Sequence, residues 1–307
     1  MAGILIFSEN TGLALELVNA ARILGVSSPG AVSINNDEQA RALAAAGAQV
    51  YLVKKEEIVL ADVKATAAAI KQAADKAGIN IMLLASNRRG KELAGRLAQA
   101  MGAGCLTDVS AIKLNGDKIE CQRNALGGAT VATQYIEAAK KVIAIRPRTF
   151  EAATETGAGT VEEIAVEVEK SRIKVLEIKS RLGDSVDIEA AEVLVAVGQG
   201  LNSQDDLPAV EELAKKLGGE IACSKPVATD KKWLLEERII GLSGKKCKPQ
   251  LAVLLGISGQ VQFTVGIRDA RIIVAVNDDE NASINQMADY IITADLHEVV
   301  AQMNNKI

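Results

Sequence analysis

A chain of 307 residues is long enough for two domains of ordinary size. Apolar residues make up 49% of it and aromatic residues only 2%, so its cores must be filled by Ala, Val, Ile and Leu, which is typical of layered α/β proteins. A net charge of -4 without long blocks of like charge argues against nucleic-acid binding. The single histidine, His297, excludes a metal site built on two histidines of this chain.

In the first hundred residues, short apolar runs alternate with Ala-rich helical stretches. This alternation predicts right-handed βαβ units around a buried parallel sheet. The expected strands are 4–7, 31–34, 50–53 and 81–85, and the expected helices are 13–24, 38–46, 63–77 and 90–101.

From residue 107 to residue 146 the pattern changes to short strand candidates around the turns Asn115-Gly116 and Gly127-Gly128. Such turns predict hairpins that extend the same sheet. Two runs of alternating apolar and polar residues follow, 163–169 and 173–179, and we expect them to add connecting strands to one of the domains.

The α/β alternation begins again near residue 193 and shows no internal repeat of the first half. The expected strands are 193–198, 220–223, 251–256, 271–277 and 290–293, and the expected helices are 206–217, 259–266 and one that starts at 295. The sequence thus predicts an α/β protein of two domains, each a mostly parallel sheet flanked by helices. The N-terminal domain covers 1–185, with the hairpins and connecting strands, and the C-terminal domain covers 186–307.

The four cysteines have neither the spacing of metal-binding pairs nor the density of a disulfide scaffold. We expect all of them to be reduced and buried: Cys105, Cys121, Cys223 and Cys247. The first residues run into a strand without a basic leader, and no apolar run reaches the length of a membrane span, so we expect a cytoplasmic protein.

The candidate site chemistry lies in the second domain, in loops that follow its strands. Ligands of open α/β sheets bind at the carboxyl ends of the strands, where such loops gather. Gly198 and Gly200 follow the first strand, but Ser203 stands where a dinucleotide-binding pattern has its third glycine. A simple strand-to-helix turn is therefore the favoured interpretation of this loop.

Two further loops combine glycine with serine. Ser258, Gly259 and Gln260 stand between an expected strand and an expected helix, so Ser258 could cap that helix and backbone NH groups could bind a pyrophosphate. An ordinary capped helix start is the alternative. The loop 241–245 contains two glycines, Ser243 and a lysine, but lacks the spacing of a Walker A loop.

Asn277 and Asp295 end the last two expected strands, where side chains often hold a ribose or a base edge. As isolated residues they are more often turn residues and N-caps, and Asp295 is a good N-cap candidate. The run 278–280 lacks the spacing of a calcium loop and predicts a solvated turn. His297 is expected to be a surface or packed imidazole, and no nucleophile stands beside a base.

Taken in order, these segments resemble the α subunit of electron-transfer flavoproteins, whose C-terminal domain carries FAD. The resembling motifs are Val197-Gly-Gln-Gly-Leu201, Cys223-Ser-Lys-Pro226, Gly241-Leu-Ser-Gly-Lys245, Lys248-Pro-Gln-Leu251, Gly256-Ile-Ser-Gly-Gln-Val-Gln262, Ile273-Val-Ala-Val-Asn277 and Met287-Ala-Asp-Tyr290. In the first domain, Asn87-Arg-Arg-Gly-Lys91 and Asp108 also resemble this family, especially its FixB-like branch. The resemblance therefore spans nearly the whole chain.

The resemblance implies an electron-carrier subunit, not an enzyme with a substrate of its own. Such an α subunit pairs with a β subunit, takes electrons from a dehydrogenase such as an acyl-CoA dehydrogenase, and passes them to a quinone oxidoreductase; some members bifurcate electrons. The flavin domain of the family moves, and the stretch 180–188 is the candidate hinge. The alternative is a nucleotide-binding regulatory or structural subunit with reduced or no flavin activity.

The resemblance also implies a set of FAD-binding residues and no catalytic residue or metal ligand. The set is Ser224, Lys225, Gly241, Leu242, Ser243, Gly244, Ser258, Gly259, Gln260, Gln262, Phe263, Asn277 and Asp295. The implied contacts are the pyrophosphate for Ser224 and Ser258, the isoalloxazine for Lys225, flavin N5 for Ser243, the ribityl and phosphate path for Gln262, and the adenosine end for Asn277 and Asp295.

The chain departs from the usual residues of the family at six positions near the cofactor. They are Gln199 for Arg, Lys225 for Arg, Leu242 for Gln, Ser243 for Thr, Phe263 for His and Asp278 for Lys. The changes at 199, 263 and 278 remove a cation or a hydrogen-bond donor. Because a positive group near flavin N1 and the C2 carbonyl favours the anionic reduced forms, we expect a lower reduction potential, unless a neighbouring chain supplies the contact.

Overall fold

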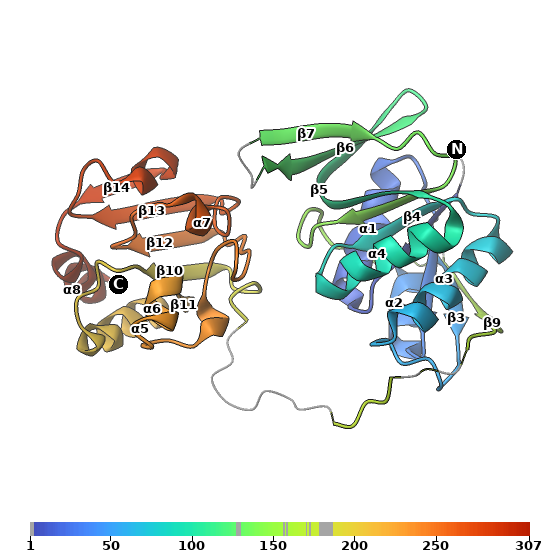
Figure 1. Cartoon of the computed structure of the whole chain (residues 1–307), viewed down its shortest axis with the longest axis horizontal. Helices are drawn as coiled ribbons and strands as arrows, with labels where there is room; N and C mark the ends of the chain where they lie inside the picture. Colours follow the sequence, from blue (N-terminus) through green and yellow to red (C-terminus); the bar gives the residue numbers. More distant parts are fainter. Residues whose placement is uncertain are drawn as a thin grey trace. The chain divides into compact units, whose positions relative to one another are not determined.

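The computed structural model describes residues 3–126, 130–155, 157, 159–169, 171, 173–177 and 187–307. The chain divides into two compact units, Met1–Ile178 and Lys179–Ile307. In each unit helices flank a mostly parallel sheet (Figure 1), which is the α/β class that the sequence predicts. The candidate hinge 180–188 lies mostly outside the described residues, and the predicted domain boundary at 185 stays a prediction.

The first unit is built on a nine-stranded sheet in the order β7-β6-β5-β8-β4-β1-β2-β3-β9. Its strands are β1 (Ile4–Phe7), β2 (Gly30–Ile34), β3 (Gln49–Val53), β4 (Ile81–Ala85), β5 (Gly104–Asn115), β6 (Lys118–Ala125), β7 (Thr130–Tyr135), β8 (Lys141–Ile145) and β9 (Thr160–Ile164). Its helices are α1 (Thr11–Ile23), α2 (Asp37–Ala45), α3 (Val63–Ala77) and α4 (Arg88–Met101). Each strand and helix expected in the first hundred residues is confirmed to within two residues at either end.

Alternate residues of these strands point to opposite faces, and helices cover both faces. In β1, Ile4 and Ile6 belong to the core formed with α1 and α2, whereas Leu5 and Phe7 belong to the core formed with α3 and α4. The helices turn buried alanines and a few large aliphatic side chains toward the sheet. A chain with few aromatic residues thus fills both cores by close approach of helix and sheet.

The hairpins lie at the β7 end of this sheet. β5 and β6 pair antiparallel around a turn at Asn115 and Gly116, and Gly116 has φ 63°, which favours glycine. β6 also pairs antiparallel with β7. These pairings confirm the predicted extension of the sheet, while the turn expected at Gly127-Gly128 lies outside the described residues.

The two connecting strands were a wrong prediction in part. β9 pairs in parallel with β3 but ends at Ile164, and the described residues 165–169 and 173–177 form no strand. The side chain of Gln72 replaces a neighbouring strand there: its Oε1 accepts from the amide of Glu167 at 2.9 Å, and its Nε2 donates to the Glu167 carbonyl at 2.6 Å. Val166 is buried in the core under this segment. The alternating pattern therefore reflects packing along the first unit without sheet pairing.

The second unit is built on a five-stranded parallel sheet in the order β11-β10-β12-β13-β14. Its strands are β10 (Val193–Val197), β11 (Glu220–Cys223), β12 (Leu251–Leu255), β13 (Ile272–Asn277) and β14 (Tyr290–Thr293). Its α-helices are α5 (Leu207–Lys216), α6 (Lys225–Thr229), α7 (Val261–Thr264) and α8 (Leu296–Lys306), and short 3-10 helices lie at Gln204–Asp206, Glu236–Arg238 and Ser283–Met287. This strand order is one of the two common orders of doubly wound sheets, and it confirms the predicted parallel sheet.

Both faces of this sheet are also buried. Val195 and Val197 of β10 belong to a core with α5, α6 and α8, whereas Leu194 and Ala196 belong to a core with α7. The described part of the chain contains no helix with the length and apolar character that a membrane crossing requires.

The four cysteines are free, but not all of them are buried. Cys121, Cys223 and Cys247 are buried, whereas Cys105 is exposed, so the prediction that all four are buried was wrong for that residue. Cys105 lies in β5, where most residues are half-buried or exposed because this strand begins the hairpin extension of the sheet.

Candidate functional site

A cleft of about 960 Å³ lies at the carboxyl ends of the strands of the second unit. All five strands contribute the loops that line it, from Gly198 after β10 to Asp295 after β14. Strand β10 lies between β11 and β12 in the sheet. The strand order therefore reverses at β10: the chain passes first to β11 on one side of it and then to β12 on the other. A reversal of this kind separates neighbouring loops and forms the ligand site of open α/β sheets. The volume is at the upper end of the roughly 300–1,000 Å³ found for small-molecule sites.

Glycines hold the two central loops against each other at this reversal. The amide of Gly200 donates to the Gly256 carbonyl at 3.0 Å, and the amide of Gly198 donates to the Leu255 carbonyl at 2.8 Å. A Cβ atom on Gly198 would lie 2.2 Å from the Gly256 carbonyl oxygen, and one on Gly200 would lie 2.7 Å from the Gly256 Cα. Gly256 has φ 59° in the left-handed region. The floor of the cleft is therefore bare backbone, which a ligand can approach closely.

Ser224 and Lys225 stand where β11 ends. Ser224 is the N-cap residue of α6, but its side chain makes no capping hydrogen bond. Its amide donates to the Val197 carbonyl at 3.0 Å, which ties this loop to the end of β10. Lys225 is exposed, and among the described residues that line the cleft it is the one lysine or arginine. The cleft thus offers an anionic ligand a single ammonium group.

The loop 241–244 reaches the cleft from the segment before β12. Gly241 has φ 139°, and a Cβ atom there would lie 2.4 Å from the carbonyl oxygen of Gln262. The amide of Leu242 donates to that same oxygen at 2.7 Å. Leu242 and Ser243 are exposed and line the cleft, as does Gln262. Glycine at 241 therefore lets the two segments meet along one wall.

Phe263 lies at the border between the cleft and the core. It is 6% exposed and belongs to the same buried cluster as Ile240 and Ile267, yet it also lines the cleft. An apolar ring therefore supports the floor at a position where an imidazole would present a polar nitrogen.

The predicted helix 259–266 and its cap at Ser258 were wrong. The helix is α7, Val261–Thr264, and its N-cap residue is Gln260 without a side-chain capping bond. Gly259 has φ 89°, which a right-handed helix cannot contain, and a Cβ atom there would lie 2.1 Å from the amide nitrogen of Ile284. The Ser258 carbonyl instead accepts from that amide at 3.1 Å. Ser258 is exposed and lines the cleft.

Asn277 is the last residue of β13, and Asp295 directly precedes α8. The Nδ2 of Asn277 donates to the Ile257 carbonyl at 3.0 Å, so this side chain joins the loops after β12 and β13. Asp295 is the N-cap of α8, as predicted, and its Oδ1 accepts from the amides of His297 and Glu298 at 2.7 and 3.2 Å. Both capping bonds use the same oxygen of this cleft-lining carboxylate.

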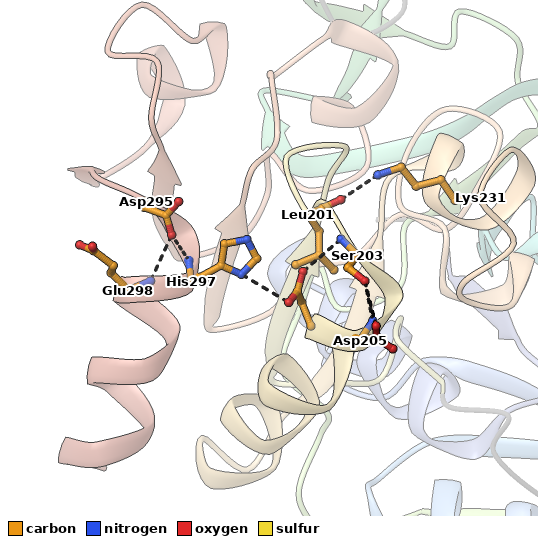
Figure 2. A network of polar contacts seen from close by, with 8 residues as sticks. Leu201, Ser203, Asp205, Lys231, Asp295, His297 and Glu298 are labelled. Carbon is orange, nitrogen blue, oxygen red and sulfur yellow. Dashed lines mark hydrogen bonds and ion pairs between the residues drawn. The ribbon is translucent and has the colours of Figure 1, made fainter.

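Figure 2 shows the contacts behind the loop that follows β10. The Lys231 ammonium donates to the Leu201 carbonyl at 2.7 Å and lies 4.1 Å from the centre of the Trp233 ring. A cation–π contact adds attraction to the hydrogen bond and restrains the lysine. Lys231 therefore supports this loop from outside the cleft.

The single histidine is a surface side chain, in line with its sequence. His297 Nδ1 lies 3.8 Å from Asp206 Oδ1, and both side chains are about one-third exposed, at 37% and 30%. Figure 2 shows it between Asp295 and the turn that contains Ser203. It joins the beginnings of α8 and α5 behind the cleft.

The structure brings eleven of the thirteen predicted cofactor-binding residues to this one cleft, and only Gly244 and Gly259 do not line it. A Cβ atom on Gly244 would lie 2.3 Å from the Ile239 carbonyl oxygen, so this glycine, like Gly259, is required by packing between loops. Sequence reasoning missed several lining residues. Gly198, Gly200 and Gly256 had been noted in candidate loops and motifs, and Asp278 as a departure near the cofactor, whereas the acidic lining residues Asp230 and Asp279 carried no signal that pointed to the site.

Cys223 ends β11 directly before the cleft-lining Ser224. Burial raises the pKa of its thiol to about 12, so the sulfur stays protonated and is a poor nucleophile. Among the described residues, no three His, Cys, Asp or Glu side chains gather as metal ligands would.

Comparison with known proteins gives two matching family models. One, described as the electron transfer flavoprotein FAD-binding domain, matches residues 187–268, and one described as the electron transfer flavoprotein domain matches residues 8–171. The chain is similar to Protein FixB of a strain of Escherichia coli, with 32% identity over 301 residues that cover 96% of this chain and 95% of that protein. It is also similar to YdiR of Escherichia coli K12, with 33% identity over 304 residues, 98% of this chain and 97% of YdiR.

The residues of the cleft fit the cofactor that this match implies. Glycines at 198, 200 and 256 let the two central loops meet without side chains, so the lining of the cleft there is backbone. Lys225 supplies a cation, and the serines at 224, 243 and 258 supply hydroxyl groups. The chain belongs to the electron transfer flavoprotein family as an α-type subunit, its second unit is the FAD-binding domain, and FAD is its cofactor.

Proposed function

We propose that this protein is the α subunit of a heterodimeric electron transfer flavoprotein and acts as an electron carrier without a substrate of its own. It accepts electrons from a flavin-dependent dehydrogenase, such as an acyl-CoA dehydrogenase, and delivers them to a quinone oxidoreductase or another acceptor. The observation that supports this proposal best is that family-like loops from five parallel strands line one cleft. Bound FAD supplies the redox chemistry, and the chain binds and orients it.

The pyrophosphate is proposed to lie over the glycine floor, between the loops after β11 and β12. Ser224 and Ser258 line this part of the cleft, and we assign their hydroxyls to the phosphate oxygens. Lys225, at the start of α6, is assigned to the isoalloxazine, where its charge attracts electron density on the ring. The beginning of a helix adds backbone NH groups of the same polarity.

The flavin is proposed to lie along the wall formed by the loop 241–244 and α7. Ser243 is assigned to flavin N5 and Gln262 to the ribityl chain, since both line the cleft. Phe263 gives the flavin ring an apolar neighbour that has no hydrogen-bond donor. This wall therefore excludes water from one side of the flavin and offers few donors to it.

Co-expression with the β subunit tests the proposal. We expect a yellow complex whose extracted cofactor has the mass of FAD and which an acyl-CoA dehydrogenase reduces in the presence of its substrate. Flavin-free complex from cells with ample FAD would contradict the cofactor role. Bound FAD that no dehydrogenase reduces would contradict the carrier role.

The second candidate, a regulatory or structural nucleotide-binding subunit, is favoured by the charge of the cleft. One lysine faces four aspartates among the described lining residues, which is an unusual balance for a site that stabilises a reduced flavin. The reduction assay separates the two candidates, because the second predicts a complex whose flavin no dehydrogenase reduces.

A further inference from the structure

Lys231 lies outside the cleft and is bonded to two of the loops that line it. Its ammonium donates to the Leu201 carbonyl at 2.7 Å and to the Gln199 carbonyl at 3.4 Å. These two carbonyls flank Gly200, whose backbone belongs to the floor of the cleft. Lys231 itself does not line the cleft, so it holds this part of the floor from behind (Figure 2).

The main chain of the same residue is tied to the start of α6. The amide of Lys231 donates to the carbonyl of Pro226, which follows Lys225 in that helix and also lines the cleft, at 3.0 Å. Among the described residues, no other side chain joins 199–202 to 224–229 by a hydrogen bond. One lysine therefore connects the loop after β10, through its ammonium, with the loop after β11, through its amide.

The ring of Trp233 restrains the lysine in this position. Lys231 Nζ lies 4.1 Å from the ring centre, and the amide of Trp233 donates to the Val227 carbonyl of α6 at 3.1 Å. The ring is half-buried and packs against the core that α5, α6 and α8 share. Because the ammonium is occupied by two carbonyls and an aromatic face, the side chain is held against the loop and away from solvent.

The peptide groups around Gly200 depend on this ammonium. Leu201 is 0% exposed, so water does not reach its carbonyl, and a buried carbonyl without a hydrogen bond is unfavourable. Without the lysine, the peptides on both sides of Gly200 have to turn toward another donor. Such a turn moves Gly200 away from the Gly256 carbonyl, to which its amide donates at 3.0 Å.

We propose that Lys231 is a positioning residue for FAD. It keeps the peptides around Gly200 in the arrangement that forms the floor, and it fixes that floor relative to Ser224 and Lys225. The proposal rests on the proposed function, in which the pyrophosphate lies over this floor and Lys225 reaches the isoalloxazine. Two sets of cofactor contacts thus depend on a lysine outside the cleft, and its loss weakens binding although every residue that lines the cleft is retained.

The first test is titration of the full α–β complex with FAD after removal of the bound cofactor. Lys231→Met keeps the length of the side chain and its contact with the Trp233 ring but removes the charged donor, so the dissociation constant should rise about tenfold. Lys231→Arg keeps a charged donor and should restore most of the affinity. Lys232→Met is the matched control: it removes the charge of the neighbouring lysine, which is exposed and does not line the cleft, and should leave the constant unchanged.

Two further measurements separate positioning from a general loss of stability. In Lys231→Met the flavin reduction potential should shift in the same direction as in Lys225→Gln, because Lys225 is no longer held in place. In the FAD-free complex the Gly200 amide should exchange its hydrogen faster, while the amides of β12 keep their rates, as expected for a local opening. Should Lys231→Met fail to fold, Lys231→Gln, whose shorter side chain carries no charge, takes its place with the same expected directions.

Three results would overturn the inference: unchanged FAD affinity in Lys231→Met, an equal loss of affinity in Lys232→Met, or faster exchange of all amides of the second unit together. The unsubstituted complex separates this failure from failure of the proposed function. A loaded complex whose flavin no dehydrogenase reduces refutes the carrier role alone. A loaded and reducible complex whose Lys231→Met variant binds FAD equally well refutes the inference alone.

Discussion

The amide of Gly200 donates to the carbonyl of Gly256 at 3.0 Å across the reversal of the second sheet. The two backbones can meet because neither residue has a side chain, and the Cα of each lies where a Cβ atom of the other would point, at 2.7 and 2.8 Å. This contact fixes the separation of the two loops on which the proposed pyrophosphate lies. Its removal should affect both the fold and the cofactor.

The substitution Gly256→Ala should lower the free energy of unfolding of the second unit by about 3 kcal/mol, because strain at positive φ adds to a clash with backbone. Gly218→Ala is the matched control: Gly218 has φ 67°, but a Cβ atom there meets nothing within 4 Å, so about 1 kcal/mol is expected. Urea unfolding followed by fluorescence measures both. Equal losses of unfolding free energy in the two variants would show that the backbone clash at Gly256 does not contribute.

Replacement of Lys225 by glutamine should weaken FAD binding roughly tenfold, the value of one charge-assisted contact, and should lower the flavin reduction potential. Lys225→Arg should restore most of both, because arginine keeps the charge. Lys246→Gln removes an exposed lysine that does not line the cleft and should change neither. Spectroelectrochemistry of the complex gives the potential, and a rise after Lys225→Gln would refute the assigned position.

The first unit offers a test of acid stability at the start of α3. Asp62 is the N-cap of this helix, and the hydroxyl of Ser171, which donates to it at 2.6 Å, holds the pKa of the carboxyl below its ordinary value, with help from the amides of Ala65 and Lys64. A lowered folded pKa gives stability that is present above the unfolded pKa, near 3.9, and is lost as the pH falls through the folded value.

Ser171→Ala should therefore raise the pKa of Asp62 and destabilise the first unit at pH 7, and this difference should vanish in acid. Asp62→Asn should keep most of the helix stability, because asparagine also caps well, but should remove the acid dependence. Carboxyl titration by NMR and unfolding at several pH values check these outcomes. An unchanged Asp62 titration in Ser171→Ala would contradict the assigned cause.

Thiol reactivity should separate the cysteines by exposure. Burial raises the pKa of Cys121 to about 11 and that of Cys223 to about 12, so alkylation of the folded protein near pH 8 should modify Cys105 first. Cys105→Ser should abolish this fast reaction. Because these folded pKa values exceed the unfolded value near 9, the buried thiols should cost stability above that pH. Rapid modification of Cys223 would show that the end of β11 opens.

The regular elements could be predicted from sequence because each has a clear period and clear ends. α3 begins and ends where expected: Asp62 caps it, and Gly78 at φ 66° terminates it. α7 could not be predicted, because its length depends on contacts between Gly259 and Ile284, 25 residues apart in the sequence. Local pattern carries no information about such an approach of two loops.

The candidate site likewise contains residues that could be predicted from the sequence and residues that could not. The glycine and serine loops were recognisable, since strand ends of a parallel sheet converge. The acidic turn at Asp278 and Asp279 carries the signature of a solvated loop, and its acids are indeed exposed. The resemblance marks Asp278 as a departure near the cofactor, whereas Asp279 is placed at the cleft only by the structure, in which Asn277 binds both this turn and the Ile257 carbonyl.

Trp233, the single tryptophan of the chain, is held beneath Lys231 behind the loop that follows β10. Tryptophan emission therefore comes from one place in the second unit, beside the cofactor loops, and the first unit contributes none. The chain therefore has a built-in optical reporter for the flavin domain: we expect its emission to follow cofactor loading and unfolding of the second unit without any added label.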